Sequence, residues 1–264
     1  MKEFQNTDYW AIILGGSSGL GLASAKKLAQ HGMNICIIHR NPRSEMEAIQ
    51  SDFDVIRSNG IEFLSFNTDA INKDKIAEVI SEIKNKIGEK GSIRCLVHSI
   101  AKGNLKPMAS KTETPLSTDD FQITLQAMAI SLYDWTKSIF KDNLFAKDAR
   151  IISFTSEGNT KAMPYYGAVS AAKAALEAIS RNIALEFAPF GIRSNCIQAG
   201  VTNTQSLQMI PNSDKIINYS EKRNPFKRLT TPEDVANVVY LLCKDEASWI
   251  NGAIIPVDGG ERIS

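Results

Sequence analysis

The sequence predicts an α/β protein of the Rossmann type, with a doubly wound parallel sheet of about seven strands and helices on both faces. Apolar runs of strand length alternate with longer stretches of helical periodicity along the chain of 264 residues. The runs are almost continuously apolar, which is typical of parallel strands that are buried on both faces. A glycine-rich segment joins the first run to the first helical stretch, as a tight strand-to-helix turn requires.

Each element follows from this alternation. The expected strands are residues 9–14, 33–38, 61–66, 93–98, 150–155, 192–197 and 253–257. The expected helices are residues 19–31, 43–58, 73–87, 118–145, 164–188 and 232–243. Right-handed crossovers between parallel strands place these helices on both faces of one sheet. No linker, repeat or low-complexity segment interrupts the order, so we expect a single domain over 1–264.

Composition excludes several classes of partner. The net charge of +1 gives no electrostatic reason to expect nucleic acid or an acidic membrane surface as a partner. No apolar run approaches 18 residues, and the first ten residues lack the apolar core of a signal peptide. We therefore expect a cytoplasmic protein that does not span a membrane.

The cysteines and histidines do not predict a metal site. The four cysteines each lie in an apolar run and form no CxxC pair, so they are expected to be small buried thiols. The three histidines show no metal-ligand spacing. His98 ends a buried strand and is expected to be structural.

The segment "ILGGSSGLGLASA" has the composition of a nucleotide-binding turn. Its glycines are spaced G-x-x-x-G-x-G, directly after the first strand and at the start of the first helix. Glycine permits the tight turn and lets the backbone approach a pyrophosphate, while the helix N-terminus offers free N–H groups and a positive dipole end. The two serines add hydroxyl donors. The predicted nucleotide contacts are Gly15, Ser17, Ser18, Gly19, Leu20 and Gly21.

The end of the second strand favours NADPH over NADH. A carboxylate at this point commonly binds the adenosine ribose hydroxyls, whereas an arginine accommodates a 2′-phosphate. Residues 38–44 contain no acid, but they contain Arg40 and Arg43. A guanidinium is well shaped for phosphate. The alternative is that both arginines are solvated surface charges and that the cofactor is NADH.

The segment "NTDA" follows the third strand. Asp69 is placed to accept a hydrogen bond from the adenine amino group, and it could equally cap the helix that begins near Asn72. Asp69 and its neighbour Ala70 are candidate cofactor contacts.

The segment "YYGAVSAAK" holds two tyrosines and a lysine. Tyr166 lies seven residues before Lys173, which is about two helical turns away on nearly the same face. If the helix begins at Pro164, both tyrosines lie in its first turn and point about 100° apart. One of them then packs against the fold. The spacing to the lysine favours Tyr166 as the catalytic hydroxyl, with Tyr165 as the alternative.

These segments together resemble the short-chain dehydrogenase/reductase family over essentially the whole chain. The sequence departs from the common family pattern twice. His98-Ser99-Ile100-Ala101 replaces the usual Asn-Asn-Ala-Gly after the fourth strand, and Val169 replaces the tyrosine four residues before Lys173. Both departures are similar to the divergent branch of enoyl-acyl-carrier-protein reductases, in which "HSI" and Tyr-x6-Lys are typical.

The resemblance implies reduction of the 2,3 double bond of an enoyl thioester, carried on acyl carrier protein, by NADPH. Tyr166 would stabilise the oxyanion that develops on the thioester oxygen, and Lys173 would hold the nicotinamide ribose hydroxyls. The charge of Lys173 is also expected to lower the pKa of the tyrosine.

A serine is a further catalytic candidate. The branch often has a second tyrosine ten residues before the catalytic one, and this chain has Ser156 there. The common family uses a serine of this loop to bind the substrate carbonyl, so Ser156 is assigned that role, with Thr155 as the alternative.

The resemblance also implies further contacts and an assembly. Gly103 would lie where the substrate thioester approaches. The family typically forms homotetramers through its long helices. The other implied cofactor contacts are Ser99, Ile100, Ala101, Gly200, Thr202 and Thr204.

Residues 200–225 are polar and long for a connection in a compact domain, so a lid or substrate-binding loop is expected. Its apolar residues suit an acyl-chain pocket, and they equally suit a loop that packs onto the domain. They are Leu207, Met209, Ile210, Ile216 and Ile217.

Two other functions compete with the enoyl reductase. A carbonyl or alcohol oxidoreductase of the same fold is the main alternative, and Val169 argues against it. A nucleotide-binding regulatory protein would be expected to have lost Tyr166 or Lys173, and this chain retains both.

Overall fold

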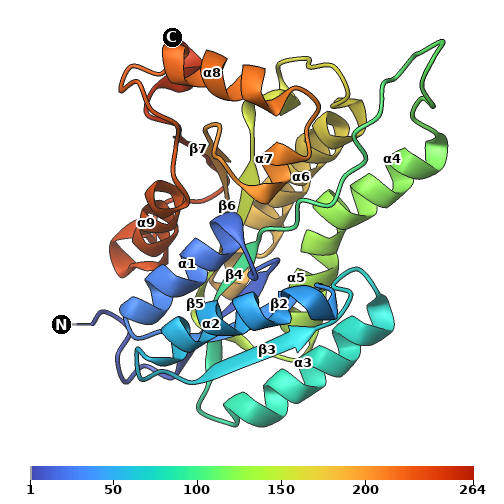
Figure 1. Ribbon diagram of the computed structural model, residues 1–264. Helices are drawn as coiled ribbons and strands as arrows, with labels where there is room; N and C mark the ends of the chain where they lie inside the picture. The colour runs from blue at the N-terminus through green and yellow to red at the C-terminus, as the bar shows by residue number, and fades with distance from the viewer. Residues whose placement is uncertain (1) are drawn as a thin grey trace.

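The computed structural model describes residues 2–264 and confirms the predicted fold class. Seven strands form one parallel sheet in the order β3-β2-β1-β4-β5-β6-β7 (Figure 1). The strands are β1 (Tyr9–Leu14), β2 (Asn34–His39), β3 (Phe63–Asn67), β4 (Ser92–His98), β5 (Phe145–Thr155), β6 (Ile192–Ala199) and β7 (Ile254–Val257).

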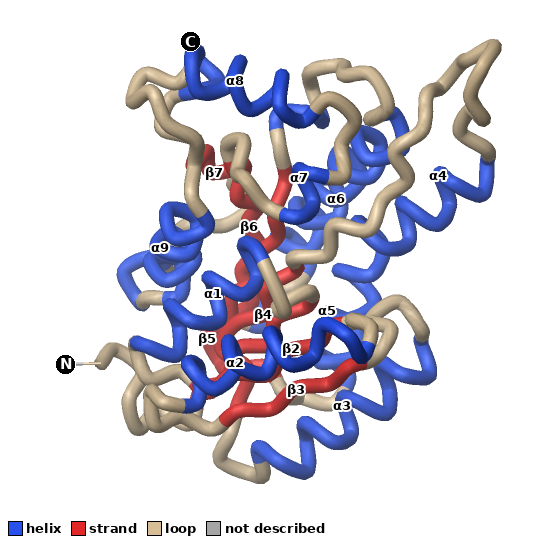
Figure 2. Tube along the Cα trace, viewed as in Figure 1, coloured by secondary structure: helices blue, strands red, loops and turns tan. Residues whose placement is uncertain are grey.

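Helices cover both faces of the sheet, and this explains why the strands are apolar without alternation (Figure 2). On β1, Ala11 and Ile13 pack with α1, α2 and α9, whereas Ile12 and Leu14 pack with α3, α5 and α6. Successive side chains point to opposite faces, so both faces of each central strand are buried. These six helices are α1 (Gly19–Gln30), α2 (Met46–Arg57), α3 (Lys73–Ile87), α5 (Ser131–Lys141), α6 (Gly167–Glu186) and α9 (Pro232–Cys243).

The prediction of one helix over 118–145 is wrong. The chain forms α4 (Thr118–Leu125), one π-helical segment (Gln126–Ile130) and then α5, and the last residue of that range already belongs to β5. A π-helical turn holds an extra residue and changes the direction in which the following side chains point. Here the side chain of Met128, inside the π-helical segment, lies on the wall of the main cavity.

The predicted start of the next helix, at Pro164, is also wrong. Helix α6 begins at Gly167, with Tyr166 as its N-cap residue. Tyr165 has a φ of +63°, which is left-handed backbone that a tyrosine rarely adopts. The two tyrosines therefore leave the chain in different directions for a backbone reason, and not because they lie 100° apart on a helix.

Two short helices occupy the 200–225 segment. They are α7 (Gln205–Gln208) and α8 (Ser213–Arg223), and α8 lies beside the C-terminus at the top of Figure 1. Thr204 caps α7 by accepting a hydrogen bond from the backbone N–H of Leu207. The segment is therefore mostly helical, which its polar composition did not indicate.

The strand order creates a crevice at the carboxyl edge of the sheet. The chain runs outward from β1 to β3 and then returns to place β4 beside β1, so the crossovers diverge between β1 and β4. The backbone N–H of Ser99 donates to the carbonyl of Leu14 across this point, at 2.8 Å. The segments that follow β1 and β4 therefore begin side by side.

The opposite edge of the sheet is held by buried arginines. Arg94 on β4 and Arg150 on β5 are each 1% exposed, and both form ion pairs with Asp148. Their guanidinium groups also donate to the carbonyls of Leu242 and Cys243 at the end of α9. These bonds satisfy carbonyls that a helix C-terminus leaves open, and they fix α9 to the sheet.

The cysteine prediction is confirmed, because all four thiols are buried and free. Among residues 2–264, no helix is both long enough and apolar enough to cross a bilayer.

Candidate active site

A cavity of about 1150 Å³ lies over the carboxyl edge of the sheet. It is larger than the roughly 300–1,000 Å³ of most small-molecule pockets, so it has room for a dinucleotide beside a substrate. Nearly all of the predicted site residues line it. Gly21 does not, and neither does Arg43, the second arginine considered for the 2′-phosphate. The predicted residues on its wall are Gly15, Ser17, Ser18, Gly19, Leu20, Arg40, Asp69, Ala70, Ser99, Ile100, Ala101, Gly103, Ser156, Tyr166, Lys173, Gly200, Thr202 and Thr204.

The N-terminus of α1 opens into this cavity without a cap. Ser18 is the N-cap residue, but its side chain makes no capping hydrogen bond, and the first turn carries no acid. By contrast Asn72, Ser117 and Thr231 cap α3, α4 and α9 with their own side chains. The first N–H groups and the positive dipole end of α1 are thus available to an anion, as a pyrophosphate site requires.

At two positions of this turn the neighbouring backbone leaves no space for a side chain, so only glycine fits. A Cβ on Gly15 would lie 2.6 Å from the carbonyl oxygen of Ser99, and a Cβ on Gly21 would lie 2.3 Å from the carbonyl oxygen of Gly15. Gly15 also has a φ of +81°. Gly21 therefore lies behind the cavity wall, where it lets α1 approach the turn, and it does not itself line the cavity.

The segment after β6 closes the same end of the cavity. A Cβ on Gly19 would lie 3.5 Å from Cγ2 of Thr204, so the start of α7 lies opposite the glycine turn. Gly200 packs against Thr230 and Asp258, where a Cβ would meet Oγ1 of Thr230 at 2.4 Å. The predicted placement of Thr204 near a pyrophosphate fits this arrangement.

Arg40 and Asp69 meet at the other end of the cavity. The Nη1 group of Arg40 donates to Oδ2 of Asp69 at 2.6 Å, and the arginine side chain is 62% exposed. The other carboxylate oxygen of Asp69 accepts from the N–H of Ile71. Asn72 caps α3 itself, so the alternative that Asp69 caps this helix is wrong.

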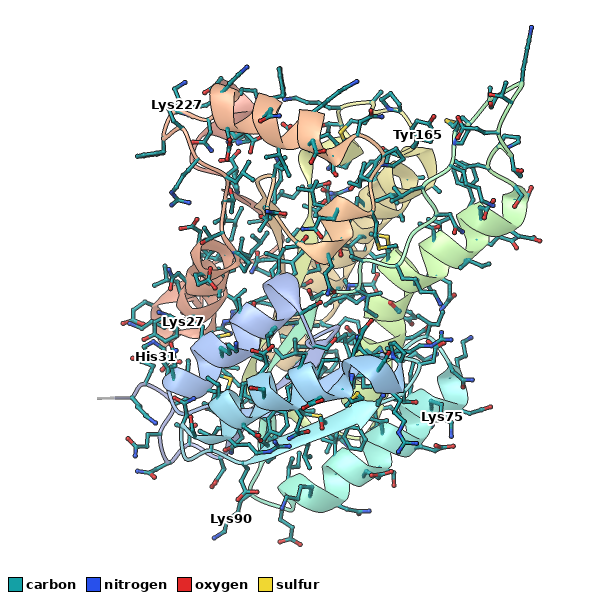
Figure 3. The ribbon with its side chains drawn as sticks, in the orientation of Figure 1. Lys27, His31, Lys75, Lys90, Tyr165 and Lys227 are labelled. Carbon is teal, nitrogen blue, oxygen red and sulfur yellow. The ribbon has the colours of Figure 1, made fainter. Side chains whose placement is uncertain are left out.

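Tyr166 points into the cavity and Tyr165 points away from it. The Tyr166 hydroxyl lies 3.4 Å from Oγ of Ser156, and the side chain is buried. The hydroxyl of Tyr165 instead donates to Oε1 of Glu113 at 2.9 Å, in the loop before α4 (Figure 3). The left-handed backbone at Tyr165 makes this divergence possible, and it favours Tyr166 as the reacting hydroxyl.

Lys173 reaches the cavity from the buried face of α6. Its Nζ donates to the carbonyl of Phe154 at 2.6 Å, which leaves two N–H donors for a ligand. Burial lowers the pKa of Lys173 to about 8. Burial also raises the pKa of Tyr166, and its contact with Ser156 opposes that change. The expected lowering of the tyrosine pKa by Lys173 is therefore not found: burial of Tyr166 is the largest effect, and Ser156 supplies the opposing one.

Val169 occupies the place between the tyrosine and the lysine. It lies on the cavity wall, and a Cβ on Gly103 would meet its Cγ2 at 2.6 Å and Sδ of Met128 at 2.9 Å. The loop after β4 can therefore approach α6 closely only because residue 103 is a glycine. An apolar surface results at the point where the common family pattern has a hydroxyl.

Helix α8 is joined to the loop that follows β5 and carries Ser156 by ion pairs that the sequence did not predict. Arg223 pairs with Glu157, which follows Ser156, and with Glu261 near the C-terminus. The second carboxylate oxygen of Glu261 accepts from the N–H of Val201, at 3.2 Å. All three charged residues line the cavity. These residues lie far apart in the sequence, and no local spacing marked them as partners.

The apolar residues predicted in the 200–225 segment separate into two groups. Leu207, Ile210 and Ile216 line the cavity, whereas Ile217 and Met209 do not, and Met209 is 72% exposed. The segment therefore contributes an apolar part of the cavity wall, and Ile210 packs against the cluster that contains Tyr166. Such a surface suits a hydrocarbon chain.

His98 is structural, as expected. Its Nε2 lies 2.8 Å from Oγ of Ser131, whose hydroxyl donates to the carbonyl of Ala127. Burial lowers the pKa of His98 to about 3, and the nearby charge of Lys173 contributes. A neutral histidine thus holds β4 against the π-helical segment.

Comparison with known proteins adds three findings. A family model described as enoyl-(acyl carrier protein) reductase matches residues 15–261. The enoyl-(acyl-carrier-protein) reductase (NADH) FabI of Enterococcus faecalis is 27% identical over 260 residues, covering 98% of this chain and 99% of that protein. The 3-oxoacyl-(acyl-carrier-protein) reductase FabG of Chlamydia muridarum is also 27% identical, over 250 residues that cover 95% and 96%.

A solved structure shows the same architecture together with a nucleotide. It is the enoyl-acyl carrier protein reductase of Bacillus cereus with NADP⁺ and indole naphthyridinone, at 26% identity and a TM-score of 0.87. The match covers 100% of this chain and 99% of that one. Relatives of equal identity thus include an enoyl reductase and a 3-oxoacyl reductase. Only the geometry of the site can therefore discriminate between these two activities for this chain.

Proposed function

The chain belongs to the short-chain dehydrogenase/reductase family of NAD(P)-dependent oxidoreductases, and on that premise we propose that it reduces the 2,3 double bond of an enoyl thioester with NADPH. One observation carries the proposal. The buried hydroxyl that faces the cavity belongs to Tyr166, seven residues before Lys173, while Val169 occupies the place four residues before it.

The position of the hydroxyl suits an enolate oxygen. Tyr166 precedes Val169 by three residues, which is a rise of about 4.5 Å if both are placed along a helix axis. In a ketone, the atom that accepts hydride carries the oxygen directly. In an enoyl thioester hydride goes to Cβ, and the negative charge develops on the thioester oxygen, two carbons farther away. A hydroxyl that lies farther from the lysine along the helix therefore fits an enoyl thioester better than a ketone.

The other residues support this chemistry. NADPH would supply the hydride, and the uncapped end of α1 together with Lys173 would bind its pyrophosphate and ribose. Ser156 and Tyr166, whose hydroxyls lie 3.4 Å apart, can both donate to one substrate oxygen placed between them. A proton from solvent then adds to Cα, which completes the saturated acyl thioester and leaves NADP⁺ as the second product.

The preference for NADPH is supported by Arg40. Its ion pair with Asp69 is exposed, and such pairs contribute only about 0–1 kcal/mol. A 2′-phosphate can therefore take over the guanidinium at little cost. Asp69 remains available to the adenine amino group, as its place beside Ala70 on the cavity wall allows.

Arg40→Ala is expected to raise the dissociation constant for NADPH by about 10- to 100-fold, because a charge-assisted bond to phosphate contributes about 1.5–3 kcal/mol. The dissociation constant for NADH should change less than threefold. Cofactor fluorescence measured with both nucleotides tests this. Arg43→Ala is the matched control, because Arg43 does not line the cavity. An equal loss for the two nucleotides would contradict the assignment of Arg40 to the phosphate.

The proposal extends to the substrate carrier, the assembly and the location. The apolar wall formed by Leu207, Ile210 and Ile216 suits the acyl chain of a thioester on acyl carrier protein. Ile130 and Tyr133 are exposed at the start of α5, which supports a homotetramer built through this helix. A cytoplasmic location fits a substrate of fatty-acid synthesis.

A substrate panel tests the proposed function. NADPH oxidation is followed by absorbance with crotonyl and longer 2-enoyl thioesters, and with an acetoacetyl thioester as the competing keto substrate. We expect kcat/KM for the enoyl substrates to exceed that for the keto substrate by at least about 100-fold, which corresponds to a difference of about 2.7 kcal/mol in transition-state binding. Turnover of the keto thioester alone would contradict the proposal and indicate a carbonyl reductase.

A further inference from the structure

A buried carboxylate lies one turn beyond the catalytic lysine. Glu177 is 6% exposed and follows Lys173 by four residues on the buried face of α6. It does not line the cavity, and none of the roles assigned above uses it. A carboxylate is almost never buried to this extent without partners, so its contacts call for an explanation.

The partners of Glu177 lie on both sides of Ser156. Its Oε1 accepts from the hydroxyl of Thr155 at 2.6 Å and from the side-chain amide of Asn159. Lys173 meanwhile holds the carbonyl of Phe154. The loop that carries Ser156 is thus fastened to α6 immediately before the serine and three residues after it. The bond to Thr155 also occupies that hydroxyl, which removes Thr155 as the alternative donor to substrate.

Glu177 also supplies charge beside Lys173. The titratable groups that face the lysine are Glu177 on α6, Cys196 on β6, His98 on β4 and the Tyr166 hydroxyl. Burial raises the pKa of Cys196 and of Tyr166 and lowers that of His98, so all three are neutral near pH 7. Cys196 and Glu177 both oppose the loss of the lysine proton. Because the Cys196 thiol is neutral near pH 7, the charge comes from Glu177, which accepts two hydrogen bonds on one oxygen as a carboxylate does.

We propose that Glu177 is a positioning residue of the active site, which fixes the Ser156 loop against α6 and keeps Lys173 charged. The proposal rests on the proposed function, since it takes Lys173 as the residue that binds the ribose of NADPH. It assigns Glu177 no contact with substrate or cofactor.

Two variants separate the charge from the hydrogen bonds. Glu177→Gln keeps the length of the side chain and removes the charge, and Glu177→Asp keeps the charge and shortens the reach. Cofactor fluorescence gives the dissociation constant for NADPH between pH 7 and 10. In the wild type we expect the affinity for NADPH to fall as Lys173 loses its proton, near its pKa of about 8. With glutamine, we expect this midpoint to move down by about one pH unit, because the compensating charge is gone.

Glu177→Asp should retain the wild-type midpoint, and its kcat should fall by about tenfold because the Ser156 loop is no longer fastened. Glu186→Gln, on the exposed end of the same helix, is the matched control and should change neither quantity. A wild-type midpoint in Glu177→Gln would overturn the charge role, and a wild-type kcat in Glu177→Asp would overturn the positioning role.

The binding measurement is independent of the substrate. If the wild-type protein failed to reduce enoyl thioesters while Glu177→Gln still shifted the midpoint, the proposed function would fail and the inference about Glu177 would stand. If Glu177→Gln does not fold, Glu177→Asp is used alone. Its kcat then tests the positioning role, and a pH midpoint of NADPH binding that differs from the wild-type value would contradict the charge role.

Discussion

Replacing Tyr166 with phenylalanine is expected to lower kcat for enoyl thioester reduction by about 10²- to 10³-fold and to leave the affinity for NADPH unchanged. The range is that found for removing one donor from an oxyanion site, about 2.7–4 kcal/mol. The variant removes only the hydroxyl. The ring keeps its packing against Gly158 and Met163, and it lies so close to Gly158 that a Cβ there would be 2.6 Å from Cε1 of the ring. Steady-state kinetics and cofactor fluorescence on the same preparation separate the two quantities.

Tyr165→Phe is the matched control for this variant. Its hydroxyl contacts Glu113 in the loop before α4 and does not reach the cavity. We expect its kcat to fall by less than threefold. If Tyr165→Phe lost as much activity as Tyr166→Phe, the assignment of the oxyanion donor from the spacing to Lys173 would be wrong.

The same tyrosine pair shows what the sequence could predict about the site. The spacing between Tyr166 and Lys173 and the presence of Val169 are properties of the chain alone, and the strands could be predicted because buried parallel strands are continuously apolar. The glycine turn could also be predicted, but for another reason: its spacing follows from backbone geometry within a few residues.

The features that the sequence did not predict depend on contacts between distant segments. The left-handed backbone of Tyr165 is compensated by a hydrogen bond to Glu113, 52 residues away. The ion pairs of Arg223 join α8 to residues 66 and 38 positions away. Nothing in the neighbouring sequence distinguishes the helix position of Glu177, and only the fold places Thr155 and Asn159 against it. Local propensity carries no information about such pairs.

Gly21→Ala is expected to raise the dissociation constant for NADPH by about 30- to 100-fold, although Gly21 does not line the cavity. Two effects oppose each other at this position. Alanine in a helix is favoured over glycine by about 0.5–1 kcal/mol. Its Cβ, however, would lie 2.3 Å from the carbonyl oxygen of Gly15, which is backbone and cannot rotate away. Overpacking of this kind costs about 1–3 kcal/mol, so the steric effect is the larger.

The glycine turn must therefore move away from α1 in this variant, and the N–H groups that would bind the pyrophosphate move with it. Gly60→Ala, after α2, is the control: Gly60 has a φ of +75°, and a Cβ at this position would have no heavy atom within 4 Å. Alanine there costs about 1–2 kcal/mol of stability through left-handed strain. The two variants should thus unfold at similar urea concentrations, while only Gly21→Ala loses NADPH affinity. If Gly21→Ala and Gly60→Ala bound NADPH equally tightly, the glycine turn would tolerate displacement, and the contact between α1 and the turn would not orient the pyrophosphate site.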